Sequence, residues 1–319
     1  MRCAVLGALT VLLLGACGER VADHLDAIRR SGRRFVHGEG LIRYEDTPAE
    51  RSVAPRLREM AGGRALLEQG KSAVPALVEL LDDPDRRTLA AVFLAEIGGS
   101  DAAAELLRRW RSLRDDAKEK RILLPVAGGQ VALGYRYEGV DDDFYGELIM
   151  ALGYAGLPVS AEIAKDTEVA IAESDRLAAA GEELVFREER EEDGRMIELR
   201  WSAEPAETAS EGLKILALLR APDAPSLFEK AIRSPVRRLR RTGVQEVLFL
   251  GDAADRMLPV LGPLLDDPDL RVEAVQQVAF LLDDGATTES VPVHHLSGEQ
   301  QAALAIRCKE RLKELGHLR

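Results

Sequence analysis

The sequence predicts a mostly α-helical fold: an α-solenoid of stacked helical hairpins that carries small β-hairpin and loop insertions. Three observations predict this fold class. Helix-forming residues are abundant, whereas aromatic residues make up only 4% of the chain. The hexapeptide LLDDPD occurs twice, at residues 80–85 and 264–269. Apolar residues recur at helical spacing around both copies, as they do in amphipathic helices.

Composition limits the classes of function. The chain has 319 residues, of which 46% are hydrophobic and 31% charged, and this suits a soluble protein with a sizeable core. Its formal net charge of −12 is opposite to the charge that binds the phosphate backbone of nucleic acids. We therefore expect no nucleic-acid partner.

The first 17 residues have the pattern of a secretory signal. Arg2 is followed by an unbroken stretch of apolar or small residues, 3–16. This stretch is shorter than the ~20 residues that span a bilayer, but it matches the apolar region of a signal peptide. The alternative is a first core helix, but the stretch lacks the regularly spaced polar residues of an amphipathic helix.

The end of this stretch, Leu14-Gly15-Ala16-Cys17, resembles the lipobox of bacterial lipoprotein precursors, although Gly15 is a less usual residue at its position. The resemblance implies removal of residues 1–16 and lipidation of Cys17, with palmitate among the acyl chains that form a stable membrane anchor. It also implies a lipid-anchored protein of the bacterial cell envelope that faces the periplasm. Gly18 stands where aspartate signals inner-membrane retention, which favours the outer membrane.

Each LLDDPD copy is predicted to join two antiparallel helices. Asp83 is expected to be the N-cap of the second helix, with Pro84 at its first position and Gly98 at its end. Asp267 and Pro268 repeat this arrangement. Around the first LLDDPD copy, the positions expected to face the core are Val74, Leu77, Val78, Leu80, Leu81, Leu89, Val92, Phe93 and Ile97. Around the second copy they are Val272, Val275, Val278, Ala279 and Leu282, and Gly285 should end that helix.

A third unit starts at Ser234-Pro235 and ends at Gly251. Pro235 and Pro268 are 33 residues apart, and a fixed period of this size is typical of a helical solenoid. On these residues the units resemble the short HEAT-like repeats of bacterial proteins and of phycobilin lyases. Residues 144–173 are interpreted as a degenerate unit of the same kind.

These patterns divide the chain into a signal peptide at residues 1–16, a tether with a loop-rich lead-in at 17–56, and a HEAT-like solenoid at 57–319. Two insertions interrupt the solenoid, near 123–143 and 182–204. The first carries a strand signal, an apolar alternation over residues 131–137. The second has the pattern of a hairpin, with Asp193-Gly194 as its turn. Such insertions either carry a binding function or cover an end of the solenoid.

A basic cluster is the main candidate for binding an anion or a partner. Its members are Arg233, Arg237, Arg238, Arg240 and Arg241. Arginine binds carboxylates and phosphates with two parallel hydrogen bonds. The alternative is that these arginines form salt bridges between repeats of a very acidic chain.

Other polar clusters are interpreted as structural. Residues 141–143 are three aspartates without the spaced ligands of a calcium loop, and we expect a solvated turn before a helix. His294-His295 lacks further metal ligands nearby. Ser297 and Gln300 have the pattern of a capping box. Cys308 is expected to be a helix-packing residue, and the acidic run 188–193 an exposed hairpin face.

We find no catalytic motif, and we expect neither enzymatic activity nor a cofactor or metal. The sequence favours a membrane-anchored envelope lipoprotein that binds or scaffolds a protein partner through its repeats. One alternative is an envelope enzyme or ligand-binding protein with its site in the inserted segments. Another is a protein like the bilin lyases, although export argues against it because that chemistry is cytoplasmic. Neither the partner nor the oligomeric state follows from the sequence.

Overall fold

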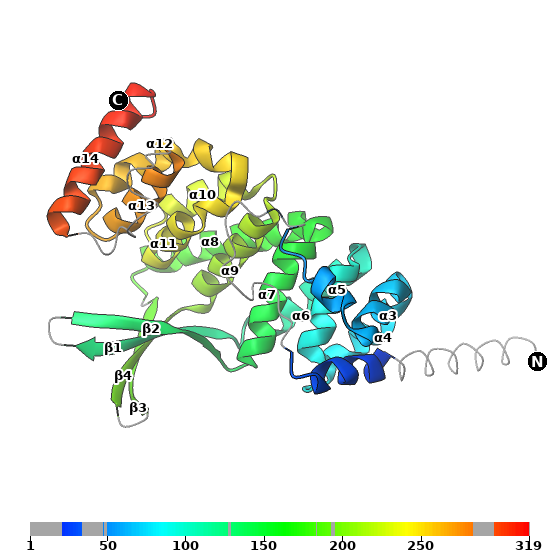
Figure 1. The fold of residues 1–319 in the computed structure, drawn as a ribbon. Coiled ribbons are helices and arrows are strands. Elements are labelled where there is room, and N and C mark those ends of the chain that lie inside the picture. Colours follow the sequence, from blue (N-terminus) through cyan, green and yellow to red (C-terminus); the bar gives the residue numbers. More distant parts are fainter. Residues whose placement is uncertain are drawn as a thin grey trace, which may run out of the picture. The chain divides into compact units, whose positions relative to one another are not determined.

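The computed structural model describes residues 21–33, 47, 50–126, 129–182, 184–192, 195–282 and 297–318, without the side chains of residues 125–135. Several predicted features lie outside the described residues, namely Cys17, Asp193-Gly194, Gly285 and His294-His295. The chain forms two compact units (Figure 1). The first is Met1–Ala117 with Tyr137–Ser160, and the second is Lys118–Arg136 with Ala161–Arg319.

The first unit is built from helices. After a helix at residues 21–30, its elements are α2 (Ala54–Arg58), α3 (Ala61–Gln69), η1 (Gly70–Ala73), α4 (Val74–Glu79), η2 (Leu80–Asp82), α5 (Arg87–Ile97), α6 (Ser100–Leu113), α7 (Asp142–Ala155) and η3 (Leu157–Val159). Helix α5 packs against α4, α6 and α7. The largest side chains in this core are the fully buried Phe93, Trp110 and Tyr145.

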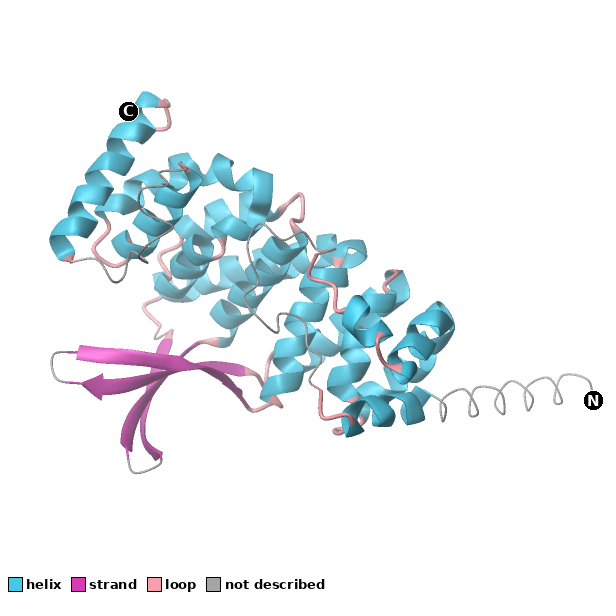
Figure 2. Ribbon diagram, in the orientation of Figure 1, coloured by secondary structure: helices cyan, strands magenta, loops and turns pink. Residues whose placement is uncertain are grey.

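The second unit combines a small sheet with helices (Figure 2). Its elements are β1 (Lys118–Val126), most of β2 (Gly129–Glu138), α8 (Ser160–Ala179), β3 (Val185–Glu192), β4 (Arg195–Ser202), α9 (Glu204–Leu219), α10 (Ala224–Arg233), α11 (Arg237–Gln245), η4 (Val247–Met257), α12 (Leu258–Leu261), η5 (Gly262–Asp266), α13 (Arg271–Leu281) and α14 (Gly298–Glu314). Helix α11 packs against α9, α10 and α13.

The predicted fold class is confirmed, because the described chain is mostly helical and carries one small sheet. Most of the positions expected to face the core are buried, including Leu77, Phe93 and Val278. Gly98 ends α5 and Gly251 interrupts η4, both at positive φ, as predicted. The stretch interpreted as one degenerate repeat is divided between the two units, since α7 belongs to the first and nearly all of α8 to the second.

The two predicted insertions form a single sheet. Its strand order is β2-β1-β4-β3, and β4 runs antiparallel to both β1 and β3. Ile122 is paired with Leu199, and Phe186 with Trp201. The first inserted segment begins at Lys118, ahead of the expected 123, because the charged residues that open β1 conceal its alternation.

In both LLDDPD copies the second aspartate holds a turn. The carboxylate of Asp83 accepts a hydrogen bond from the backbone N–H of Asp85 (2.9 Å), and that of Asp267 accepts one from Asp269 (2.8 Å). The following helix begins at Arg87 in the first copy, so the predicted N-cap at Asp83 is wrong, and the same holds for the second copy. The aspartate side chain satisfies the backbone of the Asp-Pro turn instead, which delays the helix.

The acidic residues of both turns also form ion pairs with neighbouring helices. The pairs are Asp82 with Arg109 of α6 (2.7 Å), Asp85 with Arg29 of the helix at 21–30 (3.0 Å), Asp266 with Lys309 of α14, and Asp269 with Arg237 of α11 (3.3 Å). In each copy the first acid pairs with a later helix and the last acid with an earlier one. Each turn is thereby linked to helices on both sides.

Among the described residues, no single helix is both long and apolar enough to cross a bilayer. The bent pair formed by residues 142–155 and 157–179 meets that criterion only when its two helices are taken together.

Candidate functional site

The β3–β4 hairpin carries exposed apolar side chains. Within the described ranges, seven large hydrophobic side chains are exposed, and three of them, Val185, Phe186 and Met196, lie on this hairpin. Isolated exposed apolar residues are ordinary on protein surfaces, whereas a concentration of them marks a contact site. The strand register places Phe186 on one face of the hairpin and Val185 and Met196 on the other. The face that carries Phe186 is the best candidate for a binding surface in the second unit, because Trp201 lies beside it.

A stacked aromatic pair forms the centre of this candidate surface. Phe186 and Trp201 face each other across the two strands, with ring centroids 5.7 Å apart. The ammonium group of Lys120 lies 4.3 Å from the centroid of the Trp201 ring and 3.0 Å from a carboxylate oxygen of Glu188. Half-exposed aromatic rings next to paired charges combine an apolar contact area with polar groups, as interfaces between proteins do.

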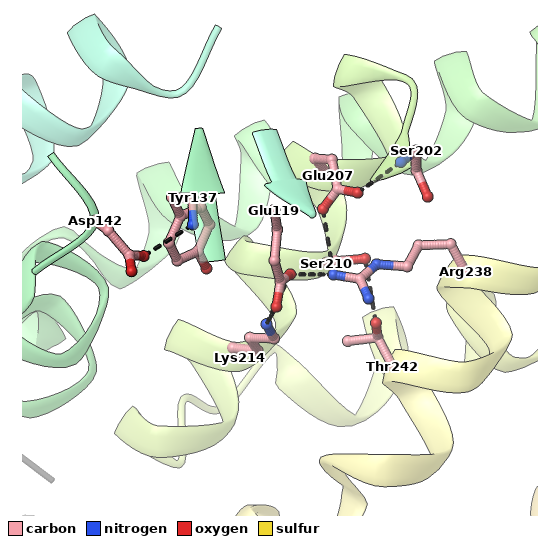
Figure 3. A network of polar contacts seen from close by, with 9 residues as sticks. All are labelled: Glu119, Tyr137, Asp142, Ser202, Glu207, Ser210, Lys214, Arg238 and Thr242. Carbon is pink, nitrogen blue, oxygen red and sulfur yellow. Dashed lines mark hydrogen bonds and ion pairs between the residues drawn. The ribbon is translucent and has the colours of Figure 1, made fainter. Parts of the chain in front are cut away.

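A buried network of charges joins this sheet to the helices of the second unit (Figure 3). Glu119 projects from β1, and both of its carboxylate oxygens accept hydrogen bonds from Lys214 of α9, at 3.0 and 3.1 Å. Arg238 of α11 forms an ion pair with the same carboxylate. Arg238 also lies 3.2 Å from a carboxylate oxygen of Glu207 on α9. One strand is thus joined to two helices.

The network is well shielded from water. Glu119 is 7% exposed and Glu207 is 3% exposed. The second carboxylate oxygen of Glu207 accepts a hydrogen bond from the backbone N–H of Ser202, at 3.0 Å. A hydrogen bond of 3.2 Å from the hydroxyl of Thr242 to that of Ser210 links α11 to α9 beside it. Buried charges are tolerated only when they are paired in this way.

The shared environment moves the pKa values of the network apart. Burial would raise the pKa of Glu119, but Lys214 and Arg238 lower it to about 2. Burial raises the pKa of Glu207 against the opposing effect of Arg238, and burial also raises that of Glu246. Burial would lower the pKa of Lys214, but Glu119 raises it. One carboxylate is therefore strongly ionised beside two cations, while two carboxyls keep their protons to higher pH than usual.

The raised pKa of Glu207 gives a testable pH dependence. A raised carboxyl pKa stabilises the folded state below the unfolded pKa, and this contribution is lost as the pH rises through the folded pKa. The variant Glu207→Gln has no such titration and keeps a hydrogen-bond acceptor. We expect its free energy of unfolding, measured by urea titration, to increase relative to that of the native chain between pH 4 and pH 8.

Glu204 supplies the matched control, because it lies exposed in the first turn of the same helix. The free energy of unfolding of Glu204→Gln should change with pH in the same way as that of the native chain over the same range. The assignment of a raised pKa to Glu207 would be contradicted if the free energy of unfolding of Glu207→Gln, taken relative to the native chain, stayed constant or fell as the pH rises.

The structure places the five arginines of the predicted basic cluster in ion pairs. The partners are Glu229 for Arg233, Asp269 for Arg237, Glu119 and Glu207 for Arg238, Asp267 for Arg240, and Glu273 for Arg241. Three of these arginines reach the second LLDDPD turn or α13, and one reaches the sheet. This geometry favours the salt-bridge alternative, and an anion-binding role of the cluster stays a prediction.

Most of the remaining candidates have structural contacts. Asp141 caps α7 by accepting a hydrogen bond from the backbone N–H of Phe144 (2.9 Å), in agreement with the expected turn. In the described part of the chain, no group of three or more potential ligand side chains could hold a metal ion. The capping box of Ser297 and Gln300 is confirmed, and Cys308 is buried in α14. In the acidic run, Glu188 and Glu192 pair with Lys120, Arg136 and Arg190, so this face is not simply solvated.

Sequence reasoning missed the buried network because its members come from distant segments and form no motif. One local signal was available. Glu207, Glu211 and Lys214 are spaced four and three residues apart, which places them on one face of an otherwise apolar helix. All three are charged, and Glu207 and Glu211 are buried. Charged residues at helical spacing in an apolar segment predict a buried polar network.

Comparisons with known proteins give no family. No family model matches the sequence, and no curated protein matches it. Among solved structures, the chain is similar to the complex of CpcE and CpcF of phycocyanin lyase from Nostoc sp. PCC7120, with 16% sequence identity and a TM-score of 0.32. That match covers 88% of this chain and 98% of the other. The TM-score is too low to indicate a common fold, so the similarity carries no argument about function.

Proposed function

We propose that this protein is a lipid-anchored, non-catalytic binding protein of the bacterial envelope, and that its inserted sheet contacts a protein partner. The anchor follows from the resemblance of residues 14–17 to a lipobox. The binding role rests on a single observation, the exposed apolar and aromatic side chains of the β3–β4 hairpin.

The manner in which the hairpin is held supports this role. Its neighbour β1 is fixed to α9 and α11 by the ion pairs of Glu119, Lys214 and Arg238. A rigid support reduces the entropy that a surface loses when it binds a partner. The edge strand β3 is rich in charged residues, which discourages the addition of further strands. Side-chain contacts through Phe186 and its stacked partner Trp201 are therefore the proposed mode of recognition.

Photo-crosslinking in intact cells tests the binding role. A photoreactive phenylalanine analogue replaces Phe186, and the controls place it at Met196 on the opposite face of the hairpin and at Ile306 on α14, both of which are more exposed than Phe186. We expect the analogue at Phe186 to capture one protein and neither control position to capture it. Capture of that protein from Met196 or Ile306, or of nothing from Phe186, would refute the Phe186 face of the hairpin as the binding surface.

Cell fractionation tests the anchor separately. The native chain should be found with membranes and should incorporate labelled palmitate, whereas Cys17→Ser should do neither. A native chain that is already soluble, or palmitate labelling that Cys17→Ser leaves unchanged, would rule out the anchor.

A further inference from the structure

Positive charge is concentrated at the start of the chain. Residues 18–73 contain eleven Arg and Lys and nine Asp and Glu, whereas residues 74–319 contain 31 and 46 respectively. The described parts of this segment, 21–33 and 50–73, hold eight basic and five acidic residues. A protein with a strongly acidic body therefore has, after its predicted lipidation site, a segment of slightly positive net charge whose arginines, apart from Arg20, begin at Arg29.

The structure gathers several of these arginines on one surface of the first unit. Arg33 forms an ion pair with Glu59 (3.2 Å), and both side chains are more than half exposed. The guanidinium of Arg64 donates two hydrogen bonds to the backbone carbonyl of Arg58, each at 3.2 Å. Arg58 immediately precedes Glu59, so Arg33, Arg58 and Arg64 lie near one carboxylate that pairs with Arg33, and three positive side chains stand beside one negative one.

A hollow on the helix at 21–30 adds a concave site. Its volume is about 370 Å³, and Asp26, Arg29, Arg30 and Arg86 line it. Arg86 is held by ion pairs with Asp26 (2.7 Å) and Asp83. Arg29 is held by Asp85 and Asp26, whereas Arg30 is exposed and forms no ion pair with the described residues.

We propose that this basic surface docks onto a bilayer that contains anionic phospholipids, with Arg30 at the hollow contacting a phosphate headgroup. This surface consists of Arg29, Arg30, Arg33, Arg58, Arg64 and Arg86. The inference rests on the proposed lipid anchor, because an anchor at Cys17 ends only four residues before the helix at 21–30 begins. Guanidinium groups bind phosphate oxygens in pairs, and basic residues near an anionic surface add directly to membrane affinity.

Docking would give the anchored protein a fixed orientation. The lipid alone tethers one end of the chain and leaves the first unit free to rotate. With its arginines against the headgroups, the first unit would be held on the membrane by a defined face. The acidic remainder of the chain carries the charge of the lipids and would be repelled from that surface.

Hydrogen exchange of the full acylated protein in nanodiscs tests the docking. One set of nanodiscs contains neutral phosphatidylcholine and the other contains phosphatidylglycerol in addition. We expect residues 21–33 and 54–64 to exchange more slowly on the anionic nanodiscs, and we expect 1 M salt to abolish the difference because it shortens electrostatic range to about 3 Å. The double variant Arg30→Gln/Arg58→Gln should lower the ratio of docked to undocked protein about thirtyfold.

The control is Arg176→Gln/Arg311→Gln, which removes two exposed arginines of the second unit and should leave the protection unchanged. Equal exchange on both kinds of nanodisc refutes docking and leaves the anchor intact. A chain that binds only the anionic nanodiscs refutes the anchor and supports docking, and one that binds neither refutes both. If added inorganic phosphate slowed the exchange of these residues on neutral nanodiscs, the surface would bind free phosphate and would not be a membrane-docking surface.

Discussion

Replacing Arg238 with methionine is expected to lower the free energy of unfolding by about 3–5 kcal/mol. The substitution leaves the buried carboxylates of Glu119 and Glu207 with Lys214 as the remaining cation of the network. An uncompensated buried charge is costly because it has lost its hydration without gaining a partner. Urea unfolding, followed by circular dichroism, measures the change.

The neighbouring residue on the same helix provides the control. Arg237 pairs with Asp269, but both side chains are about half exposed, so Arg237→Met should cost at most about 1 kcal/mol. The double variant Arg238→Met/Glu207→Gln should recover part of the loss, because it also removes the carboxyl that Arg238 no longer pairs with and keeps the ion pair of Glu119 with Lys214. Equal effects of Arg237→Met and Arg238→Met would show that the network contributes no more than a surface ion pair.

Replacing Gly212 with alanine is expected to destabilise the second unit by about 1–3 kcal/mol, although alanine favours helix. A Cβ atom at Gly212 of α9 would lie 2.0 Å from the hydroxyl oxygen of Thr167 on α8. That hydroxyl is fully buried and donates a hydrogen bond to the carbonyl of Ile163 (2.7 Å), so it has no room to move. Thermal unfolding measures the change.

Two further variants separate the clash from any general effect of alanine. The double variant Gly212→Ala/Thr167→Ala removes the obstructing hydroxyl and should restore most of the stability. Gly146→Ala, in the middle of α7, meets nothing within 4 Å and should stabilise by up to about 1 kcal/mol. If Gly212→Ala also stabilises, α8 and α9 are not as close as the structure places them.

The sequence predicted the features that depend on local chemistry. Helical spacing identified the buried faces around both LLDDPD copies, and glycine at positive φ marked the ends of segments at Gly98 and Gly251. The capping box at Ser297 was recognised because both of its members lie within one turn. The hairpin of β3 and β4 was found from its alternation of apolar residues.

The features that the sequence did not predict depend on residues far apart in the chain. The pairing of β1 with β4 joins segments separated by the whole of α7 and α8, and nothing in either segment specifies its partner. Glu119 and Arg238 likewise meet only through the fold. The sequence pattern placed the start of the helix after each Asp-Pro turn too early. The aspartate side chain accepts a hydrogen bond from a backbone N–H of the turn itself, and the helix starts later.

The repeated turn has a consequence for how such a chain can grow. Because Asp82 and Asp266 each take a cation from a later helix, and Asp85 and Asp269 one from an earlier helix, every copy has the same two electrostatic requirements. The basic partner is a lysine in one of these four ion pairs and an arginine in the other three. A duplicated hairpin would keep both ion pairs wherever each neighbour offers one positive side chain, and the hexapeptide can then be reused as a connector as long as the apolar faces of the neighbouring helices also match.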